Sequence, residues 1–175
     1  MDTSTEMSIM IEEGRGNLLE ADVNALVNTV NIVGVMGKGI ALQFKRAFPA
    51  NFRAYREACQ RGEIRLGHVW TFDTGVLGSR RYILNFPTKG HWRDQSRIED
   101  IRAGLDSLVA TVAERGIGSV AIPALGCGNG GLEWHDVRPL IEGACARIPG
   151  VRAMIFPPEG MPKGNGPQRV GRLTG

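Results

Sequence analysis

The sequence has 175 residues, of which 42% are apolar and 22% charged, and a formal net charge of +3. These values fit one globular domain with its own core and exclude an intrinsically disordered chain. No run of about 18 apolar residues occurs, so no membrane partner is expected. Residues 1–8 lack the basic and apolar segments of a secretory signal, which predicts a cytoplasmic protein.

Short apolar stretches alternate along the chain with segments of helical periodicity. Strands are expected at residues 9–12, 25–29, 68–73, 81–86, 119–123 and 151–156. Helices are expected at residues 40–48, 51–60, 96–115 and 134–148. Asn51 is the expected N-cap of the second helix, and Ser96 with Glu99 is a candidate capping box for the third. The alternation predicts an α/β domain with helices on both faces of a mixed sheet.

The composition changes after residue 157, where Pro and Gly dominate and few side chains can build a core. We therefore expect residues 1–157 to form the domain and residues 158–175 to be a tail or a linker to a further C-terminal region. Cys59, Cys127 and Cys145 are widely spaced and odd in number, which argues against a disulfide framework. The three histidines also lack metal-ligand spacing, so no metal and no cofactor are expected.

Two glycine-rich loops each follow a predicted buried strand and precede a predicted helix. They are Gly-Val-Met-Gly-Lys-Gly at residues 34–39 and Gly-Cys-Gly-Asn-Gly-Gly at residues 126–131. Glycines let backbone N–H groups approach an anion closely, and a helix N-terminus adds a partial positive charge. Either loop alone also fits an ordinary strand-to-helix turn. Together, at strand ends of one sheet, they predict a diphosphate ligand in the crevice between them.

Polar and basic residues near these loops allow two interpretations each. Asn28 and Asn31 end a predicted strand, where they suit either ribose hydroxyls or local turn caps. Seven Lys and Arg residues stand between residues 38 and 65 against two Glu residues, and a second basic group spans residues 80–93. Such groups fit a phosphate backbone, although a solvated helix face has the same pattern.

Two motifs resemble the macrodomain family. Val-Asn-Thr-Val-Asn at residues 27–31, followed by Gly-Lys-Gly-Ile-Ala at residues 37–41, is similar to the family's first signature. Ala-Ile-Pro-Ala-Leu-Gly-Cys-Gly at residues 121–128 is similar to its second loop. Longer runs at residues 28–45 and 85–93 resemble the DarG antitoxin macrodomains of DarT–DarG toxin–antitoxin systems. The resemblance extends from about residue 9 to residue 157 and implies a three-layer α/β/α sandwich with a mixed six-stranded sheet.

The resemblance also implies that ADP-ribose binds between the two loops as ligand or product. Asn31 would contact the distal ribose. Asn17 stands where many macrodomains have an Asp near the adenine, so recognition there is expected to differ. Phe156 would pack on the adenine, or else serve as a core aromatic. The implied ligand-binding residues are Asn17, Leu18, Asn28, Asn31, Val35, Gly37, Lys38, Gly39, Ile40, Pro87, Thr88, Gly126, Cys127, Gly128, Asn129, Gly130, Gly131, Leu132 and Phe156.

Lys89 is the predicted catalytic residue, because it matches the lysine with which a human relative, terminal ADP-ribose protein glycohydrolase, attacks the anomeric carbon of the distal ribose. A lysine that is desolvated or close to other cations has a lowered pKa and can act as a nucleophile. The alternative is a surface lysine that binds phosphate. That relative pairs its lysine with an Asp whose position here is Gly130. Asp73 and Asp94 are candidate replacements for this carboxylate.

His91, Trp92 and Arg93 follow Lys89 and are predicted to contact nucleic acid, with the indole stacking on a base. The resemblance implies a monomeric hydrolase that removes ADP-ribose from thymidine in single-stranded DNA. It would thereby act as an antitoxin against a cognate DarT-like ADP-ribosyltransferase toxin. The alternatives are an ADP-ribose reader without hydrolysis, a hydrolase of ADP-ribosylated protein or O-acetyl-ADP-ribose, and sequestration of the toxin by protein contact.

Overall fold

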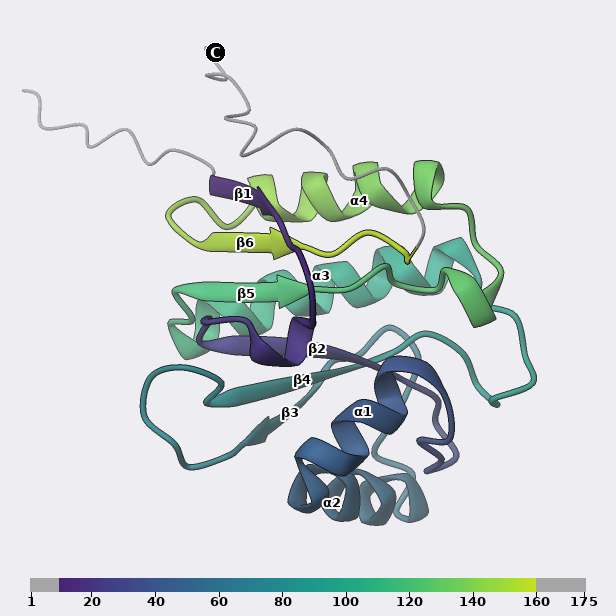
Figure 1. The fold of residues 1–175 in the computed structure, drawn as a ribbon. Helices are drawn as coiled ribbons and strands as arrows, with labels where there is room; N and C mark the ends of the chain where they lie inside the picture. Colours follow the sequence, from purple (N-terminus) through teal and green to yellow (C-terminus); the bar gives the residue numbers. More distant parts are fainter. Residues whose placement is uncertain (1–9, 160–175) are drawn as a thin grey trace, which may run out of the picture.

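The computed structural model describes residues 10–159, which form a six-stranded sheet between two layers of helices (Figure 1). The strands are β1 (Met10–Glu13), β2 (Ala25–Val30), β3 (Trp70–Asp73), β4 (Tyr82–Pro87), β5 (Ser119–Ile122) and β6 (Arg152–Ile155). Their order in the sheet is β1-β6-β5-β2-β4-β3. The neighbouring strands are parallel except β3, which pairs antiparallel with β4 at the edge. The predicted mixed sheet is therefore confirmed.

The helices cover both faces of this sheet. On one face lie the 3-10 helix η1 (Leu18–Glu20), α1 (Gly39–Ala47) and α2 (Pro49–Gln60). On the other face lie α3 (Ile98–Arg115) and α4 (Trp134–Ala146). A second 3-10 helix, η2 (Gly128–Gly130), lies inside the second glycine loop, and neither 3-10 helix was predicted. In the described part of the chain, none of the helices combines the length and the apolar character that crossing a bilayer requires.

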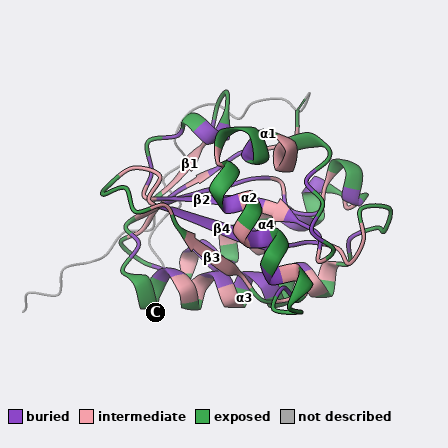
Figure 2. Ribbon diagram, turned by 90° about the horizontal axis from the view of Figure 1, so that it is seen from below, coloured by how far each residue is buried: buried purple, intermediate pink, exposed green. Residues whose placement is uncertain are grey.

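The central strands are largely apolar because helices bury them from both sides. In β2, Val27 packs toward α3 and α4, whereas Leu26 packs toward α1. The burial colours show the same sandwich, with the strands enclosed between partly exposed helices (Figure 2). This burial makes the sheet a rigid support for the loops that leave its strand ends.

Three asparagines interrupt the apolar core between the sheet and α2. Asn28 on β2 and Asn85 on β4 are partners in the strand register, and Asn28 donates its amide to Asn85 Oδ1 at 3.2 Å. Asn51 exchanges two side-chain hydrogen bonds with Asn85. The prediction that Asn51 caps α2 is thus wrong, because Pro49 already occupies the first turn and the Asn51 side chain is fully buried.

The predicted capping box at Ser96 is also wrong. α3 begins at Ile98, and its N-cap, Arg97, makes no side-chain capping bond. Ser96 instead lies under the second glycine loop, where its backbone N–H donates to the Gly130 carbonyl at 2.9 Å. The other predicted elements agree with the structure to within two residues at nearly every boundary. Of the predicted tail, residues 160–175 lie outside the described part of the chain.

Candidate active site

The carboxyl ends of the parallel strands β2, β4, β5 and β6 meet at one edge of the sheet, as Figure 1 shows. The loops that leave these strands surround a cavity of about 1190 Å³. Both glycine-rich loops contribute to its walls, together with the segment after β1 and the loop after β4. An open α/β sheet places ligand sites at this edge, so the cavity is the candidate active site.

The first loop is held in shape by Asn31. Its side-chain oxygen accepts hydrogen bonds from the backbone of Val33 and Val35, and its amide donates to the Val35 carbonyl at 2.8 Å. The buried Tyr55 hydroxyl donates to Asn31 from α2 at 2.8 Å, and burial holds the pKa of this phenol above its usual range. Asn31 lines the cavity. Its side-chain oxygen and one of its amide hydrogens, however, are already engaged in hydrogen bonds to the backbone of the loop.

The start of α1 faces the cavity without a side-chain cap. Lys38 is the N-cap residue and makes no capping hydrogen bond through its side chain, and both Lys38 and Gly39 line the cavity. The first N–H groups of a helix have no partner within the helix, and they carry partial positive charge. This end of α1 therefore suits a phosphate oxygen.

The second loop depends on glycine for its shape. Gly126, Gly128 and Gly131 have positive φ angles of 71°, 64° and 80°. The loop closes on itself through a 3.0 Å hydrogen bond from Leu132 N–H to the Gly126 carbonyl. It also approaches the first loop: a Cβ on Gly39 would lie 3.9 Å from Asn129 Nδ2. The two loops thus form opposite walls of one cavity.

Cys127 lies in this second loop and lines the cavity. Desolvation raises the pKa of its thiol to about 11. The nucleophilic form of cysteine is the thiolate, and a thiol with this pKa carries very little of it at neutral pH. Cys127 is therefore a small wall residue, and we assign it no nucleophilic role.

Asn17 and Phe156 both line the cavity, where Asn17 directly precedes η1 and Phe156 directly follows β6 in the chain. The Asn17 side-chain oxygen accepts from Leu19 N–H at 3.1 Å and caps η1. Phe156 is 8% exposed, and a Cβ on Gly14 would lie 2.4 Å from its ring. Phe156 therefore belongs to the core and to the cavity wall together, and its packing on the adenine stays a prediction.

Lys89 follows β4 and lines the cavity, and its ammonium donates to the Trp92 carbonyl at 3.0 Å. The loop that carries it is joined to the segment just before the first glycine loop, because Ile32 N–H donates to the Gly90 carbonyl at 3.2 Å. The His91 and Trp92 rings stack with centroids 3.6 Å apart. Arg93 lies near the same indole, with Cζ 5.6 Å from its centroid.

Neither candidate replacement for the carboxylate reaches the cavity wall. Asp73 lies at the opposite end of the sheet, where it forms an ion pair with Arg81. Asp94 accepts from His91 N–H at 3.0 Å and stabilises the loop after Lys89. Among the described residues of the cavity wall, Glu159 alone carries a carboxylate. In the part of the chain that the structure describes, no three His, Cys, Asp or Glu side chains gather where they could hold a metal ion.

Comparison with known protein families identifies this one, because the family model of the macro domain matches residues 27–141. The chain belongs to the macro domain family. A DNA ADP-ribosyl glycohydrolase from Thermus aquaticus is 53% identical over 154 residues, which cover 88% of this chain and 43% of that protein. The chain therefore spans less than half the length of this relative.

Two solved structures are also similar to this macro domain. The macrodomain of Mycobacterium tuberculosis DarG has a TM-score of 0.84 and 54% identity, covering 86% of this chain and 99% of that one. Thermosipho africanus DarTG in complex with ADP-ribose has a TM-score of 0.83 and 31% identity, covering 91% of this chain and 44% of that one. The predicted resemblance to DarG macrodomains and the predicted three-layer fold are confirmed.

The macro domain cavity brings together most of the residues that the sequence predicted. Those on its wall are Asn17, Leu18, Asn31, Val35, Gly37, Lys38, Gly39, Ile40, Thr88, Lys89, Trp92, Gly126, Cys127, Gly128, Asn129, Gly130 and Phe156. Asn28 does not reach it, because its side chain is fully buried in the asparagine cluster. Pro87, Gly131, Leu132, His91 and Arg93 also lie off the wall.

Several wall residues were not predicted. Arg15, Gln43, Pro123 and the segment 157–159 all line the cavity. Gln43 and Pro123 lie in the very runs that carried the family resemblance, so that signal could have found them. No motif marked Arg15 or residues 157–159, which reach the cavity because β1 and β6 are neighbouring parallel strands.

Gly130 is packed against Ser96, and this contact leads to a stability prediction. A Cβ at position 130 would lie 2.5 Å from Ser96 Oγ and 3.2 Å from Ser96 Cβ. Gly130→Ala is therefore expected to destabilise the domain by about 1–3 kcal/mol through overpacking and to weaken ADP-ribose binding. Thermal unfolding and titration calorimetry measure both effects.

Ser96→Gly supplies the control for this prediction. It removes the atoms that a new Cβ would meet, and the Ser96 hydroxyl makes no hydrogen bond in the described structure. The double variant should therefore recover most of the stability and affinity that Gly130→Ala loses. An equal loss in the single and double variants would show that the contact with Ser96 is not the cause.

Proposed function

We propose that this macro domain is a DNA ADP-ribosyl glycohydrolase that removes ADP-ribose from thymidine in single-stranded DNA. It would act in the cytoplasm, as a monomer, and would reverse the modification made by a DarT-like ADP-ribosyltransferase. The 53% identity to the Thermus aquaticus enzyme supports the activity, and the similarity to Thermosipho africanus DarTG supports the partner. Lys89 at the cavity wall is the structural observation that carries the proposal.

The two glycine loops would hold the diphosphate of ADP-ribose. The uncapped start of α1 offers backbone donors from one side, and the glycines of the second loop let the backbone approach from the other. The adenine would lie near Phe156 and Asn17, and the distal ribose near Asn31. This orientation directs the anomeric carbon toward the loop that carries Lys89.

Lys89 would act as the nucleophile in its neutral amine form. Its nitrogen attacks the anomeric carbon, a carbon–nitrogen bond forms, and the bond to the thymine nitrogen breaks. The base leaves with the electron pair and takes up the proton that the newly bonded lysine nitrogen gives up. Water then attacks the anomeric carbon, the lysine nitrogen leaves with a proton from that water, and ADP-ribose is released with the water oxygen as its new hydroxyl. The Trp92 carbonyl, 3.0 Å from the lysine nitrogen, positions this group at the cavity wall.

The direct test is release of ADP-ribose from an oligonucleotide that carries one ADP-ribosylated thymidine, followed by chromatography. We expect complete release from this substrate and slower release from a protein ADP-ribosylated on carboxylate side chains. Release from the ADP-ribosylated protein but not from the oligonucleotide would show that the substrate is modified protein. Tight binding of ADP-ribose with no release from either substrate would make the domain a reader.

A further inference from the structure

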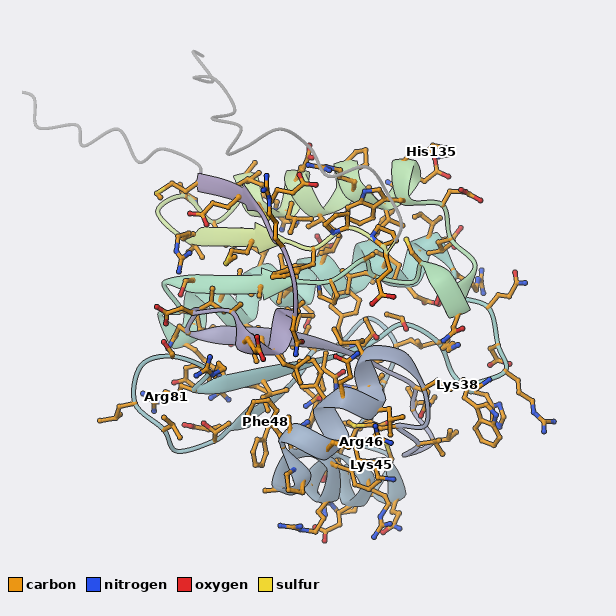
Figure 3. All side chains as sticks on the ribbon, in the orientation of Figure 1. Lys38, Lys45, Arg46, Phe48, Arg81 and His135 are labelled. Atoms are coloured by element: carbon orange, nitrogen blue, oxygen red, sulfur yellow. The ribbon has the colours of Figure 1, made fainter. Side chains whose placement is uncertain are left out.

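The exposed face of α1 and α2 carries a concentration of positive charge without partners. Lys45, Arg46, Arg53 and Arg56 all lie on these two helices, and none of them forms an ion pair in the described structure. Figure 3 shows Lys45 and Arg46 where α1 meets α2, and Lys38 at the opposite end of α1. Glu57 is the one acidic residue of the two helices.

Two of these cations converge on a single aromatic ring. Lys45 Nζ from α1 lies 4.5 Å from the centroid of Phe52, and Arg56 Cζ from α2 lies 5.6 Å from it. Cation–π contacts hold both groups beside this ring, and no described carboxylate forms an ion pair with either of them. An exposed surface of cations without ion pairs attracts an anionic partner, which would supply the counter-charge.

This cluster is continuous with the mouth of the cavity. The Arg56 side chain packs on the first glycine loop, where a Cβ on Gly34 would lie 3.2 Å from Arg56 Cγ. Just before that loop, Val33 is 46% exposed, and Ile32 N–H donates to the Gly90 carbonyl in the Lys89 loop. Residues 32–34 thus connect the helical cations to the loop that carries Lys89.

The cavity end of this path carries an exposed aromatic residue. Trp92 is 44% exposed, and its indole is held by stacking on His91 with Arg93 close by. A charged surface alone suits any polyanion, whereas an exposed indole beside it favours unpaired bases, which stack on aromatic side chains. The combination therefore favours single-stranded nucleic acid over a duplex or an acidic protein.

We infer that the strand flanking the modified nucleotide leaves the cavity at Trp92, crosses residues 32–34 and places its phosphates on Lys45 and Arg56. This path, the cationic track, consists of Trp92, residues 32–34, Lys45, Phe52 and Arg56. This inference rests on the proposed function, because it assigns a path to the DNA substrate. It adds a binding surface that begins at Trp92 on the cavity wall and continues outside the cavity, because the other residues of the track do not line it.

The test measures binding of an unmodified fluorescent oligothymidine of about 20 nucleotides by anisotropy across a salt series. Lys45→Gln with Arg56→Gln is expected to weaken binding by about tenfold at low salt and to reduce the salt slope by about 1.4. The matched control is Arg102→Gln with Arg115→Gln, which removes the same charge from α3 on the other face of the sheet. ADP-ribose affinity should stay unchanged in both variants, which also shows that they fold.

The outcomes separate this inference from the proposed function. Equal loss of affinity in the track and control variants would show a general effect of net charge and would contradict the track. Unchanged affinity in the track variant would also contradict it. No binding by the wild type would also overturn it and would favour an acidic protein as the partner of this face. Wild-type release of ADP-ribose from DNA with an unaffected track variant rejects the track alone. Selective loss of oligothymidine binding supports the track whether or not release is observed.

Discussion

Lys89→Ala is expected to reduce the rate of ADP-ribose release from ADP-ribosylated DNA by about 10²-fold or more. The substitution removes the only atom proposed to bond to the anomeric carbon. It should leave the affinity for free ADP-ribose nearly intact, because the diphosphate is expected to bind the two glycine loops. Single-turnover release from a modified oligonucleotide, together with calorimetric titration of ADP-ribose, measures both quantities.

Lys38→Ala is the matched control, since Lys38 is a second lysine of the same cavity and lies on the first glycine loop. Its loss should weaken ligand binding while the release rate at saturating substrate stays within about threefold of wild type. If Lys89→Ala instead weakens binding and keeps the saturated rate, Lys89 binds phosphate and is not the nucleophile. In that case a bound water molecule would be the candidate nucleophile.

Gly104→Ala is expected to destabilise the domain by about 1–3 kcal/mol, although alanine normally favours a helix. Gly104 lies in the buried face of α3, and a Cβ there would be 2.3 Å from Phe86 Cζ and 2.5 Å from Phe86 Cε1. The Phe86 ring is fully buried on β4, so neither side of the contact can move without disturbing the packing of helix on sheet. Denaturant unfolding measures the loss.

Gly143→Ala tests whether the cause is packing and not the helix itself. Gly143 also lies inside a helix, α4, but nothing lies within 4 Å of a Cβ at that position. This variant should be more stable than wild type by about 0.5–1 kcal/mol, because alanine lowers the conformational entropy of the unfolded chain. Destabilisation by both substitutions would contradict the assignment of the Gly104 effect to Phe86.

The sequence by itself determined the elements and most of the cavity wall. The positions of strands and helices follow from the spacing of apolar residues, which is a local property of the sequence. The glycine loops were recognisable because close backbone approach requires residues without a Cβ. Lys89 and Phe156 were placed by their resemblance to a family motif, and the structure locates both at the cavity.

Only the tertiary structure decided which polar groups meet. Asn28 and Asn51 looked like residues for a ligand and a helix cap, yet strand register and the packing of α2 bring both to Asn85. Ser96 resembled a capping residue, but it fills the space beside Gly130. These partners lie between 34 and 57 residues apart in the chain. Local sequence does not show which of these distant residues will meet, because a side chain's environment depends on which strands pair and which helix covers them.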